Sequence, residues 1–379
     1  MNLTGFDPLA ASFDDAAPLR ESLTLELDAE AEVARLAAAL HEAVHRQLRR
    51  GGAVVGISGG VDSSVVLALC VRALGPERVV GVMLPERDSS PDSARLAAEV
   101  AAQYGVQTVT EDITAALEGF GCYARRDEAI RRLFPEFGPG WKSKITLPGS
   151  LLDEGTLNVF YLTVVSPDGE ELTQRMPPRE YYQIVAASNF KQRTRMAMLY
   201  YHAEARNYAV VGTANKNEHD LGFFVKHGDA GVDVQPIAHL FKSQVYQLAG
   251  ALHVPSEVQE RTPTSDTYSA GSTQEEFFFR LPFAVLDTIW CGHERGIPAG
   301  QIAATLGLTQ EQVARVVADV VRKERTTEYL RLQAIGFGEP EVLLDRKVVH
   351  PREGAGPREG TDPRVSPPQG GEGEGRERA

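Results

Sequence analysis

Cysteine pairs and long apolar runs are missing from this chain, and each absence excludes a class of protein. Its three cysteines, Cys70, Cys122 and Cys291, are widely separated among 379 residues, and none belongs to a Cys-x-x-Cys motif. Zinc sites and redox motifs are therefore disfavoured, and reduced structural thiols are expected. No apolar run approaches the ~20 residues that span a bilayer, and the acidic N-terminus lacks the basic start of a signal peptide. The sequence predicts a cytoplasmic protein with no membrane partner.

Positive charge is also in short supply. Lysine and arginine number 39 against 52 aspartates and glutamates, which gives a formal net charge of -13. Broad nucleic-acid binding needs a basic face that releases counterions from phosphate, so the balance argues against a nucleic-acid partner. It does not exclude a small nucleotide, because such a ligand needs only a local cluster of donors.

The chain alternates short apolar runs with amphipathic segments. Apolar residues recur at helical spacing over 29–50, and Gly51-Gly52 ends that pattern. Further helices are predicted from 65, over 93–104 and around 193–205, and strands over 53–57, 79–84, 106–109 and 208–211. Such alternation indicates a parallel sheet covered on both faces. The predicted fold is a doubly wound, Rossmann-like α/β domain over 29–337, with C-terminal helices at 274–290 and 310–323.

Three segments interrupt this rhythm. Residues 1–28 show no sustained period and are predicted to be poorly ordered. Residues 119–182 are predicted to form an insertion with a β-hairpin, because β-forming residues at 157–165 precede the turn Ser166-Pro167-Asp168-Gly169. The tail 338–379 contains few large apolar residues and is predicted to be disordered, since it buries too little surface to offset its ordering entropy.

A Gly- and Ser-rich loop joins the first strand to the following helix. Its glycines let the backbone approach a ligand, and its N–H groups with the helix N-terminus form an anion site. Asp62 puts a carboxylate beside the expected phosphates, which makes sense if Mg²⁺ bridges the two. The Gly-Lys-Ser/Thr ending of a Walker loop is absent. The sequence therefore predicts a nucleotide-phosphate site formed by Gly56, Ile57, Ser58, Gly59, Gly60, Val61, Asp62 and Ser63.

The run SGGVDSS resembles the pyrophosphate loop of the ATP-pyrophosphatase superfamily. Downstream, GTANKNE at 212–218, GFFVKHGDAGVD at 222–233 and PIAHLFKSQV at 236–245 are similar to motifs of the ammonia-dependent NAD synthetase family, in the family's order. The resemblance implies a ligase that adenylates the carboxylate of deamido-NAD with ATP and then transfers ammonia to it. The products would be NAD, AMP and pyrophosphate. It also implies a homodimer, with the helix over 29–50 as a candidate interface element.

The resemblance assigns roles to individual side chains. Thr213, Lys242 and Thr264 would contact ATP, and Lys242 offers a point charge for phosphate. Glu218 is a second carboxylate that would join Asp62 on Mg²⁺, and Asp62 and Lys242 are the candidate catalytic residues. The contacts to deamido-NAD would come from Arg193, Lys226 and Asp233. No glutaminase motif is recognisable, so free ammonia or ammonia from a partner is implied.

The sequence departs from the family pattern at three places. These are the insertion 119–182, the segment 263–271 after Pro263-Thr264, and Tyr329-Leu330 where the family has a basic pair. They leave open a ligase with the same chemistry that acts on another carboxylic acid. A tRNA-modifying enzyme is disfavoured by the acidic charge, and a catalytically inactive nucleotide-binding paralogue by the presence of the candidate catalytic residues. Residues 301–313 resemble a DNA-binding helix-turn-helix, but the charge favours a packing role.

Overall fold

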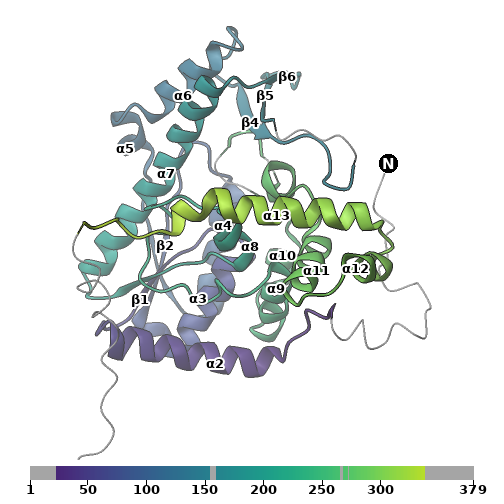
Figure 1. The fold of residues 1–379 in the computed structure, drawn as a ribbon. Helices are drawn as coiled ribbons and strands as arrows, with labels where there is room; N and C mark the ends of the chain where they lie inside the picture. The colour runs from purple at the N-terminus through teal and green to yellow at the C-terminus, as the bar shows by residue number, and fades with distance from the viewer. Residues whose placement is uncertain (1–22, 154–158, 265–267, 272, 338–379) are drawn as a thin grey trace, which may run out of the picture. The chain divides into compact units, whose positions relative to one another are not determined.

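The structure is a computed structural model that describes residues 23–153, 159–264, 268–271 and 273–337 (Figure 1). The predictions for 1–22 and for the tail 338–379 lie outside these residues. All helices and strands below belong to a compact unit that ends at Leu332, and the described residues 333–337 do not belong to it. Asp28, at the end of the segment predicted to be poorly ordered, caps the first helix through the N–H of Ala31.

A four-stranded parallel sheet in the order β3-β2-β1-β7 organises the molecule. Its strands are β1 (Ala53–Gly56), β2 (Val79–Met83), β3 (Gln107–Thr110) and β7 (Ala209–Val211). Val54 pairs with Val80 on one side and Val210 on the other. Each strand lies within about one residue of its prediction. Strands β1, β2 and β7 are almost entirely buried and read as continuous apolar runs, whereas β3, at the edge of the sheet, is largely exposed.

Alternate residues of β1 enter two separate cores. Ala53 and Val55 pack with helices α2 (Ala29–Glu42), α3 (Val61–Leu74), α4 (Pro91–Gln103) and α9 (Lys242–Ala251). Val54 faces the other way, toward Leu199 and Ala203 of α7 (Pro178–Glu204). Because side chains alternate across a strand, this division covers both faces of the sheet. The predicted doubly wound α/β fold is confirmed. Short turns follow two of these elements, namely η2 (Ala43–Gln47) and η3 (Pro76–Arg78).

The hairpin predicted within 119–182 is confirmed and gains a third strand. Strands β4 (Lys142–Thr146), β5 (Tyr161–Val165) and β6 (Glu171–Arg175) form an antiparallel sheet in that order. The helices α5 (Thr114–Gly119) and α6 (Cys122–Arg131) precede it. In Figure 1, α7 runs from the parallel sheet to this second sheet. The 27-residue helix α7 is longer than predicted. Ile184 near its start is buried against the second sheet, and Ala203 near its end is buried against the parallel sheet.

The C-terminal helices share a third core. They are α11 (Phe283–Glu294), α12 (Ala299–Leu306) and α13 (Gln310–Arg331), with the short α8 (Lys216–Leu221), α10 (Ser256–Glu260) and η4 (Glu275–Phe279) nearby. The predicted helix over 274–290 is wrong in one respect: it breaks at Arg280, which has a φ of 62°. Ile302 and Val313 are buried with Trp290, so the residues resembling a helix-turn-helix pack in this core. Among the described residues, every helix is too short or too polar to cross a bilayer.

Candidate active site

The loop after β1 depends on glycine at position 59. Gly59 has a φ of 74°, and a Cβ there would lie 2.6 Å from the carbonyl oxygen of Ser93. The hydroxyls of Ser63 and Ser64 donate to the carbonyl oxygen of Gly60, at 3.0 and 2.9 Å, and thereby fix the start of α3. The loop is held in shape by its own side chains, and it places the N-terminus of α3 just after the carboxyl end of β1, where a helix N-terminus favours an anion.

Asp62 meets Lys242 in the middle of the site. Lys242, the first residue of α9, is buried and forms an ion pair with Oδ2 of Asp62. The other oxygen of Asp62 accepts a 3.0 Å hydrogen bond from Nδ2 of Asn215. The two candidate catalytic residues are 180 positions apart in the sequence and are brought together by the packing of α9 against α3.

A buried chain of hydrogen bonds fixes the backbone of Lys242. Its N–H donates to Oδ1 of Asn217 at 2.9 Å, and Nδ2 of Asn217 donates to Oδ1 of Asp287 at 2.6 Å. Oδ2 of Asp287 accepts from both the N–H and the hydroxyl of Ser243, at 2.9 and 2.6 Å. Asn217 and Asp287 are fully buried, so this network sets the position of Lys242 without touching solvent.

Glu218 lies beside this pair at the start of α8. Its Oε2 accepts from the N–H of Asn215 at 3.2 Å, and its Oε1 accepts from Nε2 of Gln274 at 3.3 Å. Burial away from water, and secondly the nearby charge of Asp62, raise the pKa of Glu218 to about 8. A carboxylate with so high a pKa is one that a cation would stabilise in its charged form.

The donor set suits Mg²⁺ held jointly with phosphate. Among the described residues, no group of three or more His, Cys, Asp or Glu side chains is arranged to hold a metal ion alone. Mg²⁺ usually binds one or two carboxylates together with substrate phosphates, rather than an all-protein cage. Asp62 and Glu218 meet that description, because both line one cavity together with residues of the loop after β1.

Two cavities adjoin at this point. The larger has a volume of about 630 Å³ and the smaller about 250 Å³, and both are lined by Ser58, Gln192, Thr213 and Asp229. Of the residues predicted to bind ATP or metal, the larger cavity is lined by Ser58, Gly60, Val61, Asp62, Ser63, Thr213, Glu218, Lys242 and Thr264. Gly56 and Ile57 line the smaller cavity, and Gly59 lines neither.

Of the three residues predicted to bind deamido-NAD, two line the larger cavity and the third does not. Arg193 and Lys226 line the larger cavity, and Nε of Arg193 donates to the carbonyl oxygen of Lys226 at 3.2 Å. Nζ of Lys226 donates to the carbonyl oxygens of Tyr329 and Leu332, at 2.9 and 2.8 Å, at the end of α13. Asp233 lines neither cavity, and its carboxylate accepts from the N–H of Val210 and the hydroxyl of Tyr200.

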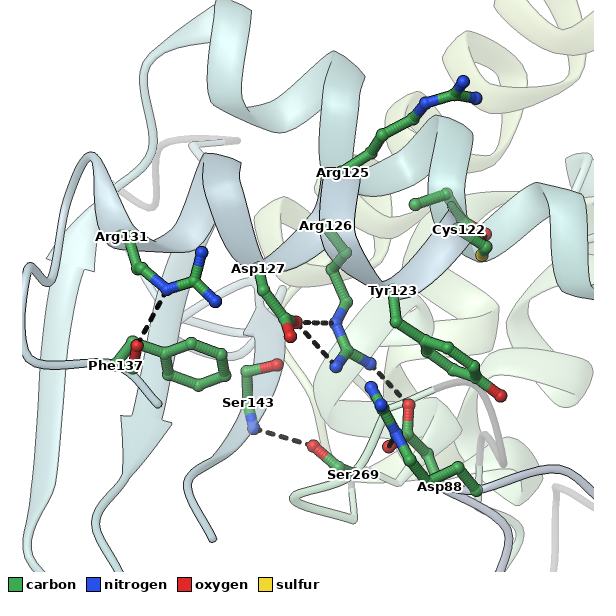
Figure 2. Close-up of polar contacts among 12 residues, drawn as sticks. Asp88, Cys122, Tyr123, Arg125, Arg126, Asp127, Arg131, Phe137, Ser143 and Ser269 are labelled. Carbon is green, nitrogen blue, oxygen red and sulfur yellow. Dashed lines mark hydrogen bonds and ion pairs between the residues drawn. The ribbon is translucent and has the colours of Figure 1, made fainter. Parts of the chain in front are cut away.

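Sequence reasoning missed a buried ion cluster that shapes the smaller cavity. Lys191 donates to Glu86 at 2.9 Å and to Asp88 at 2.7 Å. Arg126 of α6 pairs with Asp88 as well (Figure 2). This cluster anchors the loop after β2, whose Pro85 and Ser89 line the smaller cavity. Lys191 is buried, and nothing in the sequence around it indicates this.

The raised pKa of Glu218 makes a prediction about stability. The folded state holds this proton more tightly than the unfolded chain, so the contribution of Glu218 is fully present below pH 4.5 and is lost as the pH rises through about 8. Relative to wild type, Glu218→Gln is therefore expected to become more stable between pH 5 and pH 8.5. Urea unfolding of both proteins in EDTA measures this. An unchanged difference across that range would contradict the burial of an ionisable Glu218.

Comparison with known proteins agrees with this geometry. The family described as NAD synthase matches residues 32–132 and 164–331. The NH(3)-dependent NAD(+) synthetase of Mesorhizobium japonicum is 49% identical over 318 residues, covering 83% of this chain and 99% of that protein. The same-named protein of Thermotoga maritima is 41% identical over 238 residues, covering 63% of this chain and 78% of that protein.

Solved structures share the fold at lower identity. The NH3-dependent NAD synthetase from Campylobacter jejuni has a TM-score of 0.53 at 20% identity, and the alignment covers 82% of this chain and 100% of that one. The NMN synthetase from Francisella tularensis has a TM-score of 0.55 at 20% identity, covering 82% and 99%. With the family's motifs gathered around one loop and relatives matched over nearly their whole length, the chain belongs to the NAD synthase family.

Proposed function

We propose that this enzyme converts deamido-NAD, ATP and ammonia to NAD, AMP and pyrophosphate. The observation that carries the proposal is the position of the Asp62–Lys242 pair and Glu218 along one cavity that adjoins a second. A ligase of this kind needs a nucleotide and an acid side by side, with their reacting groups at a shared cluster of charges. The identity of the acid comes from the family and from relatives named NH(3)-dependent NAD(+) synthetase.

ATP is assigned to the smaller cavity and the loop after β1. Leu84, Met196 and Leu199 give the smaller cavity apolar walls suited to an adenine ring, at the carboxyl ends of β1 and β2. Ser58 and Thr213 line both cavities. The phosphate chain of an ATP whose adenine lies in the smaller cavity would therefore extend past them to the start of α3. Thr264 lines the larger cavity and is proposed as a further phosphate contact.

Asp62 and Glu218 are proposed to hold Mg²⁺. When bound there, the ion would neutralise charge on the phosphates and on the departing pyrophosphate. Lys242 supplies a second positive charge from a fixed position, because Asn217 and Asp287 hold its backbone. Such preorganised charge stabilises a transition state without reorganisation during the reaction.

The reaction has two balanced steps. A carboxylate oxygen of the acid attacks the α-phosphorus of ATP, and the bond to the bridging oxygen of pyrophosphate breaks. Ammonia then attacks the acyl carbon, AMP leaves with the carboxylate oxygen, and one ammonia proton is released. Arg193 and Lys226 are proposed to orient the dinucleotide, since both line the larger cavity. Asp233 is proposed to act indirectly, through the N–H of Val210 on β7.

A direct assay tests the proposal. Purified protein with MgATP, deamido-NAD and ammonium is expected to form NAD, AMP and pyrophosphate in equal amounts. Glutamine in place of ammonium is expected to give no NAD with the single chain. AMP formation with other acids but not with deamido-NAD would contradict the substrate and leave the adenylating chemistry in place. NAD formed from glutamine by the pure chain would contradict the ammonia source.

Two further properties are proposed from the family resemblance. The protein is proposed to be a cytoplasmic homodimer, with α2 as an interface element. One face of α2 packs on α3 and α9 through Val33, Leu36 and Leu40, while Glu30 and Arg35 lie on other faces. Light scattering coupled to gel filtration measures the mass in solution, and a monomer at micromolar concentration would contradict the dimer.

A further inference from the structure

The three places predicted from the sequence to depart from the family pattern lie around one cavity, and of these the family match itself leaves out only residues 133–163. Phe160 and Tyr181 come from the segment 119–182, Tyr268 from the altered segment after Thr264, and Tyr329 from the position of the expected basic pair. All four side chains line the larger cavity. We call these four residues the aromatic wall. Three segments that are far apart in the sequence thus each contribute aromatic side chains to the larger cavity.

Phe160 is held by a well-packed core. The match to the family omits residues 133–163, which include Phe160 and the strand β4. Ile145 and Leu162 of the second sheet, with Met176 just after it, are nevertheless buried together with Ile184 of α7. The carbonyl oxygen of Phe160 accepts from the N–H of Met176 at 3.0 Å. The ring of Phe160 is stacked on that of Tyr181, with centroids 4.6 Å apart and an angle of 22°.

The second sheet also fixes Tyr268. The N–H of Ser143 on β4 donates to Oγ of Ser269 at 3.0 Å (Figure 2). The N–H of Ala270 donates in turn to the carbonyl oxygen of Ser143 at 3.1 Å. Tyr268 is buried beside Phe277. The insertion therefore both supplies Phe160 and holds a second member of the wall.

Three rings of the aromatic wall are partly exposed, which favours a role in binding a ligand in addition to packing in the core. Phe160 and Tyr181 are half-buried, and Tyr329 remains 62% exposed at the end of α13. The backbone of Tyr329 is fixed, because its carbonyl oxygen accepts from Nζ of Lys226 at 2.9 Å. Half-exposed aromatic faces on rigid supports in a cavity are suited to stacking on a planar ring, and such stacking is insensitive to the ring's hydrogen-bonding edge.

We propose that the aromatic wall binds a planar heteroaromatic ring of the acid substrate by stacking, on the side of the larger cavity formed by the insertion. The proposal rests on the proposed function, in which the acid carries a pyridine ring and, as a dinucleotide, an adenine ring. Affinity from stacking takes the place of a charge contact at Tyr329-Leu330. The insertion is then a specificity-determining element for the acid and has no part in binding ATP.

Phe160→Leu and Tyr329→Leu test the proposal, because both keep apolar bulk and remove the aromatic face. Each is expected to raise the KM for deamido-NAD about five- to hundredfold while the KM for ATP changes less than twofold. Phe160→Tyr keeps an aromatic face and is expected to have the wild-type KM for deamido-NAD. Tyr329→Leu alters an exposed side chain, so it separates binding from folding. Tyr201→Leu on α7, an exposed tyrosine that lines neither cavity, is the matched control.

Calorimetry and a second acid complete the test. Calorimetry measures the affinity for deamido-NAD directly. In both leucine variants this affinity should fall by the same factor by which the KM rises, whether or not the wild-type enzyme converts deamido-NAD. Nicotinic acid mononucleotide lacks the adenine: an equal loss of its binding assigns the wall to the pyridine ring, and no loss assigns it to adenine. Absence of NAD formation by wild type would count against the proposed function alone. Unchanged deamido-NAD binding in folded Phe160→Leu and Tyr329→Leu, or an equal rise in the KM for ATP, would overturn the aromatic subsite.

Discussion

Asp62→Asn is expected to lower kcat about a thousandfold while leaving the protein folded. The substitution keeps the shape of the side chain and its contact with Asn215, but removes the charge that the proposed Mg²⁺ site needs. Electrostatic groups aimed at a transition state contribute about a hundred- to thousandfold each, and losing the metal adds to that. Glu218 remains beside Lys242, and loss of the Asp62 charge, which helps to raise the pKa of Glu218, favours its charged form as a partner for the buried cation.

Steady-state kinetics across a range of Mg²⁺ concentrations measure this effect. Asp92→Asn, at an exposed carboxylate in the first turn of α4, is a matched control expected to retain wild-type kinetics. Urea unfolding checks that the variant is folded. Wild-type turnover by Asp62→Asn at saturating Mg²⁺ would refute the metal and catalytic assignments of Asp62 together.

Lys242→Gln is expected to reduce both catalysis and stability. Its loss removes a fixed positive charge beside the phosphates, and kcat should fall about a hundred- to thousandfold. It also leaves Asp62 and Glu218 facing each other without their cation. Breaking a buried ion pair from one side costs about 3–5 kcal/mol, and the lower end applies because Asp62 retains 16% of its exposure.

The double variant Asp62→Asn/Lys242→Gln separates the two effects. It is expected to recover part of the lost stability, because it removes the uncompensated carboxylate, but none of the activity. Denaturant unfolding and single-turnover AMP formation measure the two quantities. Lys142→Gln, at an exposed lysine of β4, is the charge control. A Lys242→Gln enzyme with wild-type kcat would show that the buried lysine is structural only.

The sequence determined the features that are local in the chain. The apolar runs at β1, β2 and β7 identified the sheet, because a strand buried on both faces leaves its mark residue by residue. The loop around Asp62 was recognisable because its glycines, hydroxyls and carboxylate are contiguous. The motif around Asn215 and Glu218 was found in the same way, although its capping role for α8 was not.

Only the tertiary structure decided how distant groups act on one another. Lys242 was predicted to face phosphate, but its fixed position depends on Asp287, a residue that follows 45 positions later without any local signal. The buried state of Lys191 depends on Glu86 and on a helix of the insertion. Burial and ion pairing are set by whichever side chains the fold brings into contact, and spacing along the chain does not encode them. For the same reason the three departures read as unrelated in sequence, while in the fold they line a single cavity.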